Sequence, residues 1–317
     1  MAAPSDLNEI YLSSSPHFSA KRSTSEIMLC VIISLLPLCI YGVVLFKLPA
    51  LITILVSVTS CVAFEWIFQK ITKQPLRLRD LSAIVTGIML ALVLPPTTPI
   101  WMTILGAFFA IVVAKGFFGG IGANVFNPAL TGRAFLFISF PLAMSSWVQP
   151  FDGVSSATVL SEIKTGVFVA DSNMYLQYFF GNRAGCIGET SALLILIAFL
   201  FLVLAKIVDW RAPISMLAVS TLCTWISNGD ILMNLLSGGM LFGAVFMTTD
   251  YATAPVTGWG RIVFGAGCGL ITFLIRRFGG YPEGVMFSIL IMNTLTPFLN
   301  NLTPTKYGYG KKKGAKK

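Results

Sequence analysis

The sequence predicts an all-α, polytopic membrane protein of about ten transmembrane helices in two inverted five-helix halves. Three observations support this fold class. Of the 317 residues, 56% are hydrophobic and only 11% are charged, whereas an ordinary soluble domain has roughly a quarter charged residues. Apolar stretches approaching the roughly 20 residues that cross a bilayer follow one another along the chain. Finally, segments of the first half resemble segments of the second.

The apolar stretches give the spans in order. The first five are predicted at Ile27–Phe46, Leu48–Phe68, Leu81–Leu94, Ile100–Lys115 and Pro128–Trp147, and the second five at Ala192–Val208, Pro213–Ser227, Ile231–Thr248, Arg261–Ile275 and Gly284–Leu299. Several are short or interrupted by glycine and proline, and irregular backbone survives at membrane depth only where protein or a cavity satisfies it. The chain thus divides into an N-terminal tail (1–26), a first half (27–148), a loop (149–190), a second half (191–300) and a basic tail (301–317).

Two pairs of segments indicate an internal repeat. TGIMLALVLPPTTPIW, from Thr86, resembles GGMLFGAVFMTTDYATAP, from Gly238, and the segment from Gly116 resembles in layout the segment from Arg277. Five helices per half would insert the halves in opposite orientations, a plan typical of transporters whose sites lie at broken helices. The alternative is chance similarity between glycine-rich apolar segments.

The basic residues predict the orientation. The net charge is +9, and cytoplasmic loops of membrane proteins carry an excess of Lys and Arg. With both termini in the cytoplasm, only five of the 22 basic residues lie outside: Lys47, Lys164, Arg183, Arg276 and Arg277. This orientation places the loop 149–190 outside the membrane. Because the basic residues lie in short loops and a tail, and not on a folded face, we expect no binding of nucleic acid.

Soluble-type catalysis and metal ligation are not expected from the composition. The single histidine, His17, lies in the N-terminal tail and offers no Ser–His–Asp arrangement. The six cysteines form no CxxC pair, so neither a zinc site nor an iron–sulfur cluster is predicted within this chain.

The stretch from Lys115 to Phe135 is the first candidate site. Its glycines allow close approach of the backbone, and Asn127-Pro128 is typical of a helix start with an asparagine cap. Asn124 and Asn127 could hydrogen-bond a flat heterocycle. Arg133 lies about one turn inside the helix, where an unpaired charge is costly. The alternative is helix packing with a buried ion pair.

Acidic residues near membrane depth are the second kind of candidate. Asp250 follows the eighth predicted span, and such residues often mark ion pathways. The alternative for Asp250 is an ion pair with Arg133 or Arg261. Glu65 and Asp80 are weaker candidates for the same role.

Taken together, these stretches resemble a known family, which comprises the D subunit of the Rnf complex (an ion-translocating ferredoxin:NAD oxidoreductase) and the B subunit of the sodium-translocating NADH:quinone reductase. The resemblance covers nearly the whole chain. It is carried by SSSPH from Ser13, STSEIM from Ser23, residues 87–96, the NPALTGRAFLF run from Asn127, the Asp-x-x-Ser-x-Ala-Thr run from Asp152, and residues 246–255. The short N-terminal segment favours the Rnf branch of the family.

The resemblance implies a cofactor and its attachment site. The family carries FMN through a phosphoester bond on a threonine that matches Thr158, and a flavin transferase attaches it. Asp152, Ser155 and Ala157 match the recognition motif, but Ser156 stands where the family usually has glycine. The resemblance also suggests non-covalent riboflavin near Asn124 and Asn127.

The resemblance further implies a function in a complex. The chain would relay electrons between ferredoxin and NAD within a redox-driven pump, acting with the other Rnf subunits and surrounded by lipid in a bacterial or archaeal cell membrane. It would help to move Na⁺ or H⁺ and would not be catalytic alone. Two alternatives remain: the B-type subunit of a quinone reductase, and a plain secondary transporter or channel without flavin.

Overall fold

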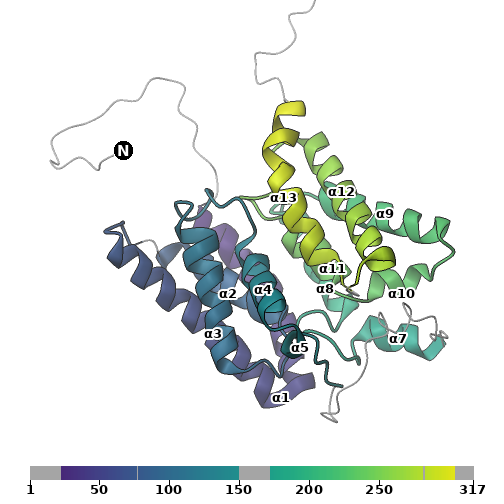
Figure 1. Cartoon of the computed structure of the whole chain (residues 1–317), viewed down its shortest axis with the longest axis horizontal. Helices are drawn as coiled ribbons and strands as arrows, with labels where there is room; N and C mark the ends of the chain where they lie inside the picture. The colour runs from purple at the N-terminus through teal and green to yellow at the C-terminus, as the bar shows by residue number, and fades with distance from the viewer. Residues whose placement is uncertain (1–22, 77, 150–171, 281–282, 304–317) are drawn as a thin grey trace, which may run out of the picture.

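In the computed structural model, the described residues 23–76, 78–149, 172–280 and 283–303 form helices, with no strand among them. The first group contains α1 (Thr24–Ile71), α2 (Ser82–Leu92), α3 (Ile100–Phe108) with its π-helical extension η2 (Phe109–Gly116), and α4 (Pro128–Ser139). The second contains α8 (Ala192–Leu204), α9 (Arg211–Ile226), α12 (Gly258–Phe278) and α13 (Val285–Leu302). Figure 1 shows the first group in purple to teal and the second in green to yellow. The prediction of an all-α membrane protein is confirmed for the described residues, as far as their fold class is concerned.

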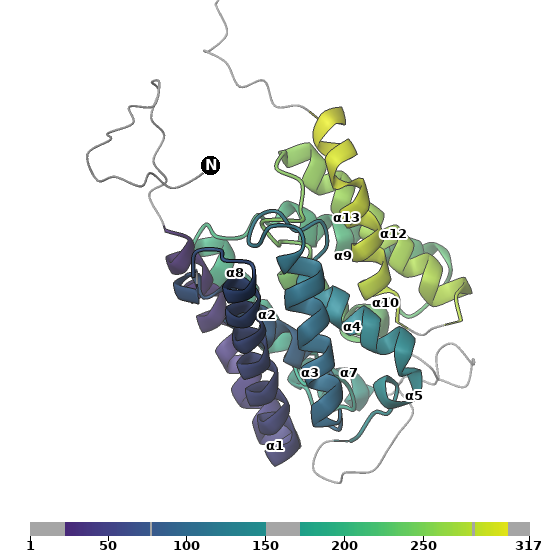
Figure 2. The same ribbon diagram turned by 60° about the vertical axis from the view of Figure 1, so that its left-hand side comes forward.

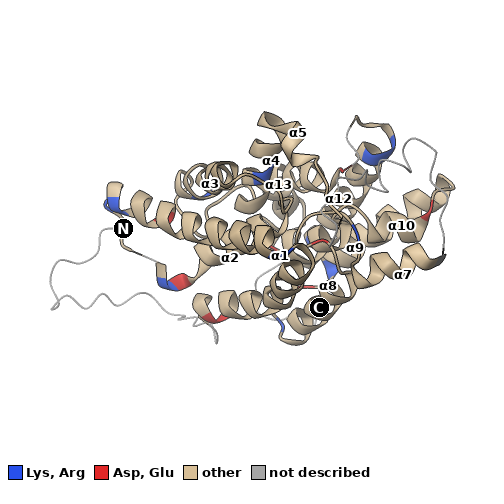
Figure 3. Cartoon of the chain, turned by 90° about the horizontal axis from the view of Figure 1, so that it is seen from below, with Lys and Arg blue, Asp and Glu red and all other residues tan. Residues whose placement is uncertain are grey.

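Three helices are long and apolar enough to cross a membrane, namely α1, α12 and α13, and α2, α3 with η2, and α8 are shorter apolar helices. Their outer faces are also apolar: Leu36, Ile40 and Leu55 of α1 are exposed. In water such faces would be unfavourable, whereas in a bilayer they contact lipid. Figure 3 shows how few charged residues interrupt the helices.

Helix α1 contains the first two predicted spans. It begins with a capping box, in which Ser23 Oγ accepts from Glu26 N and the Glu26 carboxylate accepts from Ser23 N, both at 3.3 Å. Lys47 has a φ of 56° and a ψ of −137°, so the helix axis breaks there, one residue after the predicted end of the first span. Figure 2 shows the two legs of α1 meeting at one end of the molecule.

Helix α2 ends inside the protein. Its 11 residues rise about 16 Å at 1.5 Å per residue, about half of a roughly 30 Å hydrocarbon core. The carbonyl oxygens of Leu92 and Leu94 at its end accept hydrogen bonds from Gly188 N at 2.7 Å and Ile187 N at 3.2 Å. A loop more than 90 residues further along the chain therefore supplies hydrogen-bond donors to the carbonyl groups at this helix end, which would otherwise need water as a partner.

The structure corrects three details of the predicted spans. Residues 231–248 form three short pieces and not one span: α10 (Ile231–Leu236), α11 (Met240–Phe242) and the π-helix η3 (Gly243–Met247), with a break where Gly239 has a φ of 64°. Residues 128–147 break at Phe140, where α4 gives way to α5 (Pro141–Met144). The loop predicted outside contains α7 (Ser172–Phe180), and its residues 185–191 are buried.

A single large apolar core joins the two helix groups. It includes Leu35 and Leu90 of the first group and Ile195, Phe242 and Ile289 of the second. Helix α4 packs against α13, and α1 packs against α8. The broken helices α2 and α11–η3 both contribute residues to this core.

Candidate functional site

A cavity of about 360 Å³ lies at the end of the molecule where α1 begins. Its walls come from the first turns of α1, from α2, from the glycine-rich segment before α4, and from the segment after η3. The lining includes Met28, Met89, Asn124, Asn127, Phe246 and Asp250. The cavity thus brings together three residues that the sequence analysis selected from two separate stretches, and its mostly apolar wall with a few polar groups is typical of a small-molecule site.

The glycine-rich segment shapes one wall of this cavity. Gly119, Gly120 and Gly122 have φ values of 107°, 92° and 85°, a conformation that a β-carbon would strain. These turns return the chain to the start of α4 at Asn127, which the sequence predicts as the helix cap. The prediction is confirmed, because Asn127 Oδ1 accepts from Leu130 N at 3.3 Å and Pro128 occupies the first helical position.

Both asparagine side chains retain hydrogen-bonding capacity. Asn124 Nδ2 donates to Phe126 O at 3.3 Å, and Asn127 uses its side-chain oxygen for the cap. Each amide has one acceptor and one donor group, and within the described residues Asn124 Oδ1 and Asn127 Nδ2 have no hydrogen-bond partner, so both can bond to a ligand. Both residues are buried, which fixes these groups in place.

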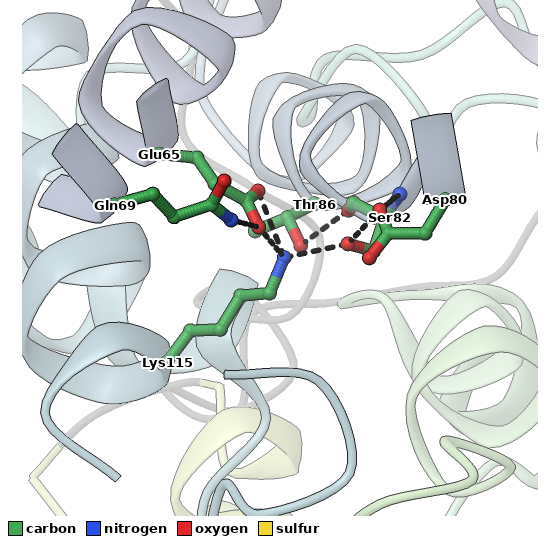
Figure 4. Close-up of polar contacts among 6 residues, drawn as sticks. All are labelled: Glu65, Gln69, Asp80, Ser82, Thr86 and Lys115. Atoms are coloured by element: carbon green, nitrogen blue, oxygen red, sulfur yellow. Dashed lines mark hydrogen bonds and ion pairs between the residues drawn. The ribbon is translucent and has the colours of Figure 1, made fainter. Parts of the chain in front are cut away.

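A buried ion pair joins three elements beside the cavity (Figure 4). Lys115 Nζ donates to the two carboxylate oxygens of Glu65 at 2.8 and 2.9 Å and to Ser82 Oγ at 2.6 Å. Gln69 donates to Glu65 Oε1 at 3.3 Å, and Ser82 Oγ donates to Asp80 Oδ1 at 2.7 Å. Glu65 is therefore neutralised by Lys115. The pairing of Glu65 with Lys115, 50 residues away, had no signal in the sequence.

Asp250 lies at the cavity and has local partners. Thr253 Oγ1 donates to Asp250 Oδ2 at 3.1 Å, and Ala252 N donates to Oδ1 at 3.4 Å. Enclosure by protein raises the pKa of this carboxyl group above its usual value, and the two hydrogen bonds oppose that rise. Among the described residues no ion pair joins Asp250 to Arg133 or Arg261, since Arg261 pairs with Asp209 at 2.6 Å. The ion-pair interpretation of Asp250 is therefore wrong.

Arg133 lies deeper than the cavity, one turn of α4 beyond Ala129. Its guanidinium contacts Glu189 at 3.3 Å and Glu283 at 2.6 Å, and Cys186 Sγ lies 3.5 Å away. The structure does not bring Arg133 to the cavity with Asn124 and Asn127, and it supports the alternative of a buried ion pair. Glu189 and Glu283 were not predicted as its partners, because each lies in a loop distant in sequence.

The predicted flavin-attachment motif lies outside the described residues. This applies to Thr158 and to Asp152, Ser155 and Ala157. The described chain resumes at Ser172, where α7 begins.

Short and broken helices with apolar outer faces, arranged around a mostly apolar cavity with a few polar groups, define an integral membrane protein whose site lies at helix breaks. The chain belongs to the NQR2, RnfD, RnfE family, whose model matches residues 11–308. It is similar to the D subunit of the Na⁺-translocating ferredoxin:NAD⁺ oxidoreductase complex of Acetobacterium woodii, with 44% identity over 98% of this chain and 100% of that protein.

Two further relatives carry related names. The D subunit of the proton-translocating ferredoxin:NAD⁺ oxidoreductase complex of Clostridium ljungdahlii is 39% identical, over 95% of this chain and 97% of the relative. The D subunit of the ion-translocating oxidoreductase complex of Stutzerimonas stutzeri is 37% identical, over 91% and 93%. The family resemblance found in the sequence is thereby confirmed.

Proposed function

We propose that this chain is the membrane-embedded D subunit of an ion-translocating ferredoxin:NAD⁺ oxidoreductase complex. The full-length similarity to three such subunits carries the proposal. The chain would not be catalytic alone, and the other subunits of the complex would be its partners. Moving one charge against about 100 mV costs about 2.3 kcal/mol, and a two-electron fall of about 50 mV supplies a similar amount.

The membrane arrangement that supports this function has ten spans in two inverted halves, with both termini in the cytoplasm. The distribution of Lys and Arg and the two half-length helices α2 and α11–η3 support this arrangement. In this orientation the cavity faces the cytoplasm, and residues 150–171 lie on the outer side. The cavity and the flavin-attachment motif would then be on opposite sides of the membrane.

We place covalent FMN on Thr158, because the run from Asp152 to Thr158 resembles the family's attachment motif. A flavin transferase would form the phosphoester bond. The flavin supplies the electron-transfer chemistry, and the chain holds it and sets its electrostatic surroundings.

We propose that riboflavin binds in the cavity as a second, non-covalent flavin. The volume of about 360 Å³ falls within the usual range of small-molecule sites, about 300 to 1,000 Å³. The apolar walls from Met28, Met89 and Phe246 would contact the flat rings. Asn124 Oδ1 and Asn127 Nδ2 would bond to their polar edge, which orients the ligand without requiring a charge.

Covalent flavin at Thr158 is tested by in-gel fluorescence. The chain is co-expressed with a flavin transferase, denatured and viewed under ultraviolet light, with Thr158→Ala beside wild type. We expect a fluorescent wild-type band and a dark Thr158→Ala band, because the phosphoester bond survives denaturation. Thr165→Ala, in the same loop but outside the motif, is the matched control and should fluoresce. Riboflavin would appear separately, in the supernatant released by denaturation.

The two alternatives give different results. A dark wild-type band beside a transferase active on another substrate would refute flavin at Thr158 and favour a plain transporter or channel. A fluorescent band in a complex that oxidises NADH with quinone as acceptor would favour the B-type subunit of a quinone reductase, which shares the family.

A further inference from the structure

Asn293 of α13 is a buried amide without a partner. Its relative exposure is 1%, and within the described part of the chain neither Oδ1 nor Nδ2 has a hydrogen bond. A buried polar group left without a bond costs about 1 to 3 kcal/mol. Buried polar groups are otherwise nearly always satisfied, so such an exception points to a bound ion or water.

The contacts of α13 show which segment Asn293 faces. Val285 and Ile289 of α13 pack so closely on Gly243 that a β-carbon at Gly243 would collide with Val285. Thr296 Oγ1 donates to Thr253 O at 2.8 Å. Asn293 lies four residues after Ile289 and three before Thr296, on the same face of the helix. Its amide therefore faces the chain between Gly243 and Thr253, where η3 ends.

The end of η3 presents oxygen atoms. The last carbonyl groups of a helix have no partner within the helix and carry its negative partial charge. In η3, Thr248 Oγ1 satisfies Ala244 O at 2.7 Å and Thr249 Oγ1 satisfies Val245 O at 2.6 Å. Among the described residues, no backbone amide from another segment bonds to the carbonyl groups that follow.

The other broken helix ends differently. The end of α2 is closed by the backbone amides of Ile187 and Gly188, so its carbonyl groups are already satisfied. The end of η3 has Asn293 on one side and the cavity on the other, since Phe246 and Thr249 line the cavity. Among the described residues, the carbonyl groups at the end of η3 have no such amide donors from another segment, and this helix end lies beside the cavity.

We propose that the end of η3 and Asn293 form a binding site for a partly dehydrated sodium ion. The ligands would be Asn293 Oδ1, the free carbonyl oxygens at the end of η3 and the buried hydroxyl of Thr248. Unwound carbonyl groups and the C-terminal ends of half-helices are the groups that coordinate Na⁺ in membrane transporters. Amide, carbonyl and hydroxyl oxygens take up no proton near neutral pH, so the site selects sodium over H⁺.

Charge around the site also favours a cation. Asp250 lies two residues beyond Thr248, at the cavity, and the negative end of the η3 dipole faces the same region. Lys115, the basic residue among the described residues that line the cavity, is already paired with Glu65. This inference rests on the proposed ion-translocating function and extends it by naming the ion and its ligands.

The test measures the thermal stability of the purified complex in sodium chloride and in choline chloride of equal concentration. A ligand that binds only the folded state raises Tm with its concentration, so wild type should have a higher Tm in sodium. Asn293→Leu should lose this difference, because leucine has a similar size but no ligand oxygen. Asn301→Leu, the same change at an exposed position of α13, is the matched control and should keep it.

A second variant, Asn293→Asp, distinguishes the loss of a sodium ligand from a folding defect caused by leucine. It keeps a ligand oxygen, so it should keep the sodium-dependent rise in Tm. Equal Tm values for wild type in the two salts would overturn the proposal, as would a sodium effect that survives in Asn293→Leu. Flavin content and electron transfer from reduced ferredoxin to NAD⁺ are measured on the same samples. Loss of these in wild type would contradict the proposed function, and the salt comparison would still report on the site.

Discussion

At the scale of single residues, several charged side chains inside the protein either form ion pairs or donate hydrogen bonds to the carbonyl groups at a helix end. Arg133 is held between Glu189 and Glu283, and Lys115 is held by Glu65. Two of the arginines that departed from the positive-inside rule are explained in the same way. Arg276 donates to Asn234 O at 2.6 Å and to Ser237 O at 3.0 Å, and Arg183 donates to Leu236 O. Both close the end of α10, so structural demand outweighs the charge bias there.

Replacing Arg133 should destabilise the protein strongly. Arg133→Leu leaves Glu189 and Glu283 without their common partner, and breaking a buried ion pair costs about 3 to 5 kcal/mol. We expect a large fall in the thermal stability of the purified complex. Arg277→Leu, the same change at an exposed arginine, should have little effect.

A triple variant tests the cause of this effect. Glu189→Gln and Glu283→Gln, combined with Arg133→Leu, remove the uncompensated charges and should recover part of the loss. If Arg133→Leu were as stable as wild type, the network would not be holding the two loops, and the interpretation of Arg133 would be wrong.

At the scale of elements, small residues allow the helices to pack at close range. Helix α12 packs on α9 through Gly265 and Gly269, where a β-carbon would collide with the carbonyl oxygens of Ala212 and Met216. This small-xxx-small spacing is typical of helix interfaces in membranes. Because lipid tails are as apolar as the helices, the hydrophobic effect does not drive helix association there, and the helices associate through close van der Waals packing.

Gly269→Val should therefore loosen the α9–α12 pair. The added side chain overlaps backbone that cannot move without shifting a helix, and such overpacking costs about 1 to 3 kcal/mol. A lower Tm of the purified complex checks this. Gly280→Ala is the control, because nothing lies within 4 Å of a β-carbon at Gly280. An unchanged Tm for Gly269→Val would show that the two helices are less tightly packed than the structure indicates.

At the scale of the whole molecule, the two helix groups meet around half-length helices with different ends. The glutamates on Arg133 come from the loop before α8 and the loop before α13, so a single residue of the first group is bound to two segments of the second part of the chain. The cavity lies toward the start of α1, and the Arg133 network lies one helical turn deeper.

The proposed orientation can be checked with thiol reagents that do not cross membranes. In a background without the six native cysteines, Lys73→Cys and Asn182→Cys place single thiols at exposed positions. With both termini in the cytoplasm, the thiol at 182 should react in intact cells and the thiol at 73 only in inverted vesicles. The opposite pattern would reverse the orientation, and labelling of both from one side would contradict the ten-span arrangement.

Much of this fold follows from local sequence, and the rest does not. The apolar stretches predict the membrane class and most helix positions, and Asn127-Pro128 predicts the start of α4. These features depend on a few neighbouring residues, so the sequence by itself determines them. The break at Gly239 was missed because hydropathy averaged over a span does not detect a short interruption between apolar pieces.

Only the tertiary structure decided which charges meet and which helix end stays open. Arg133 and Glu283 are 150 residues apart, and Lys115 and Glu65 are 50 apart. Packing of whole helices brings these residues together, and no local propensity encodes such a contact. The same holds for residues 185–191, whose polarity indicated an exposed loop. They are buried because the end of α2 requires hydrogen-bond donors that no water supplies, and the free amides of this loop provide them.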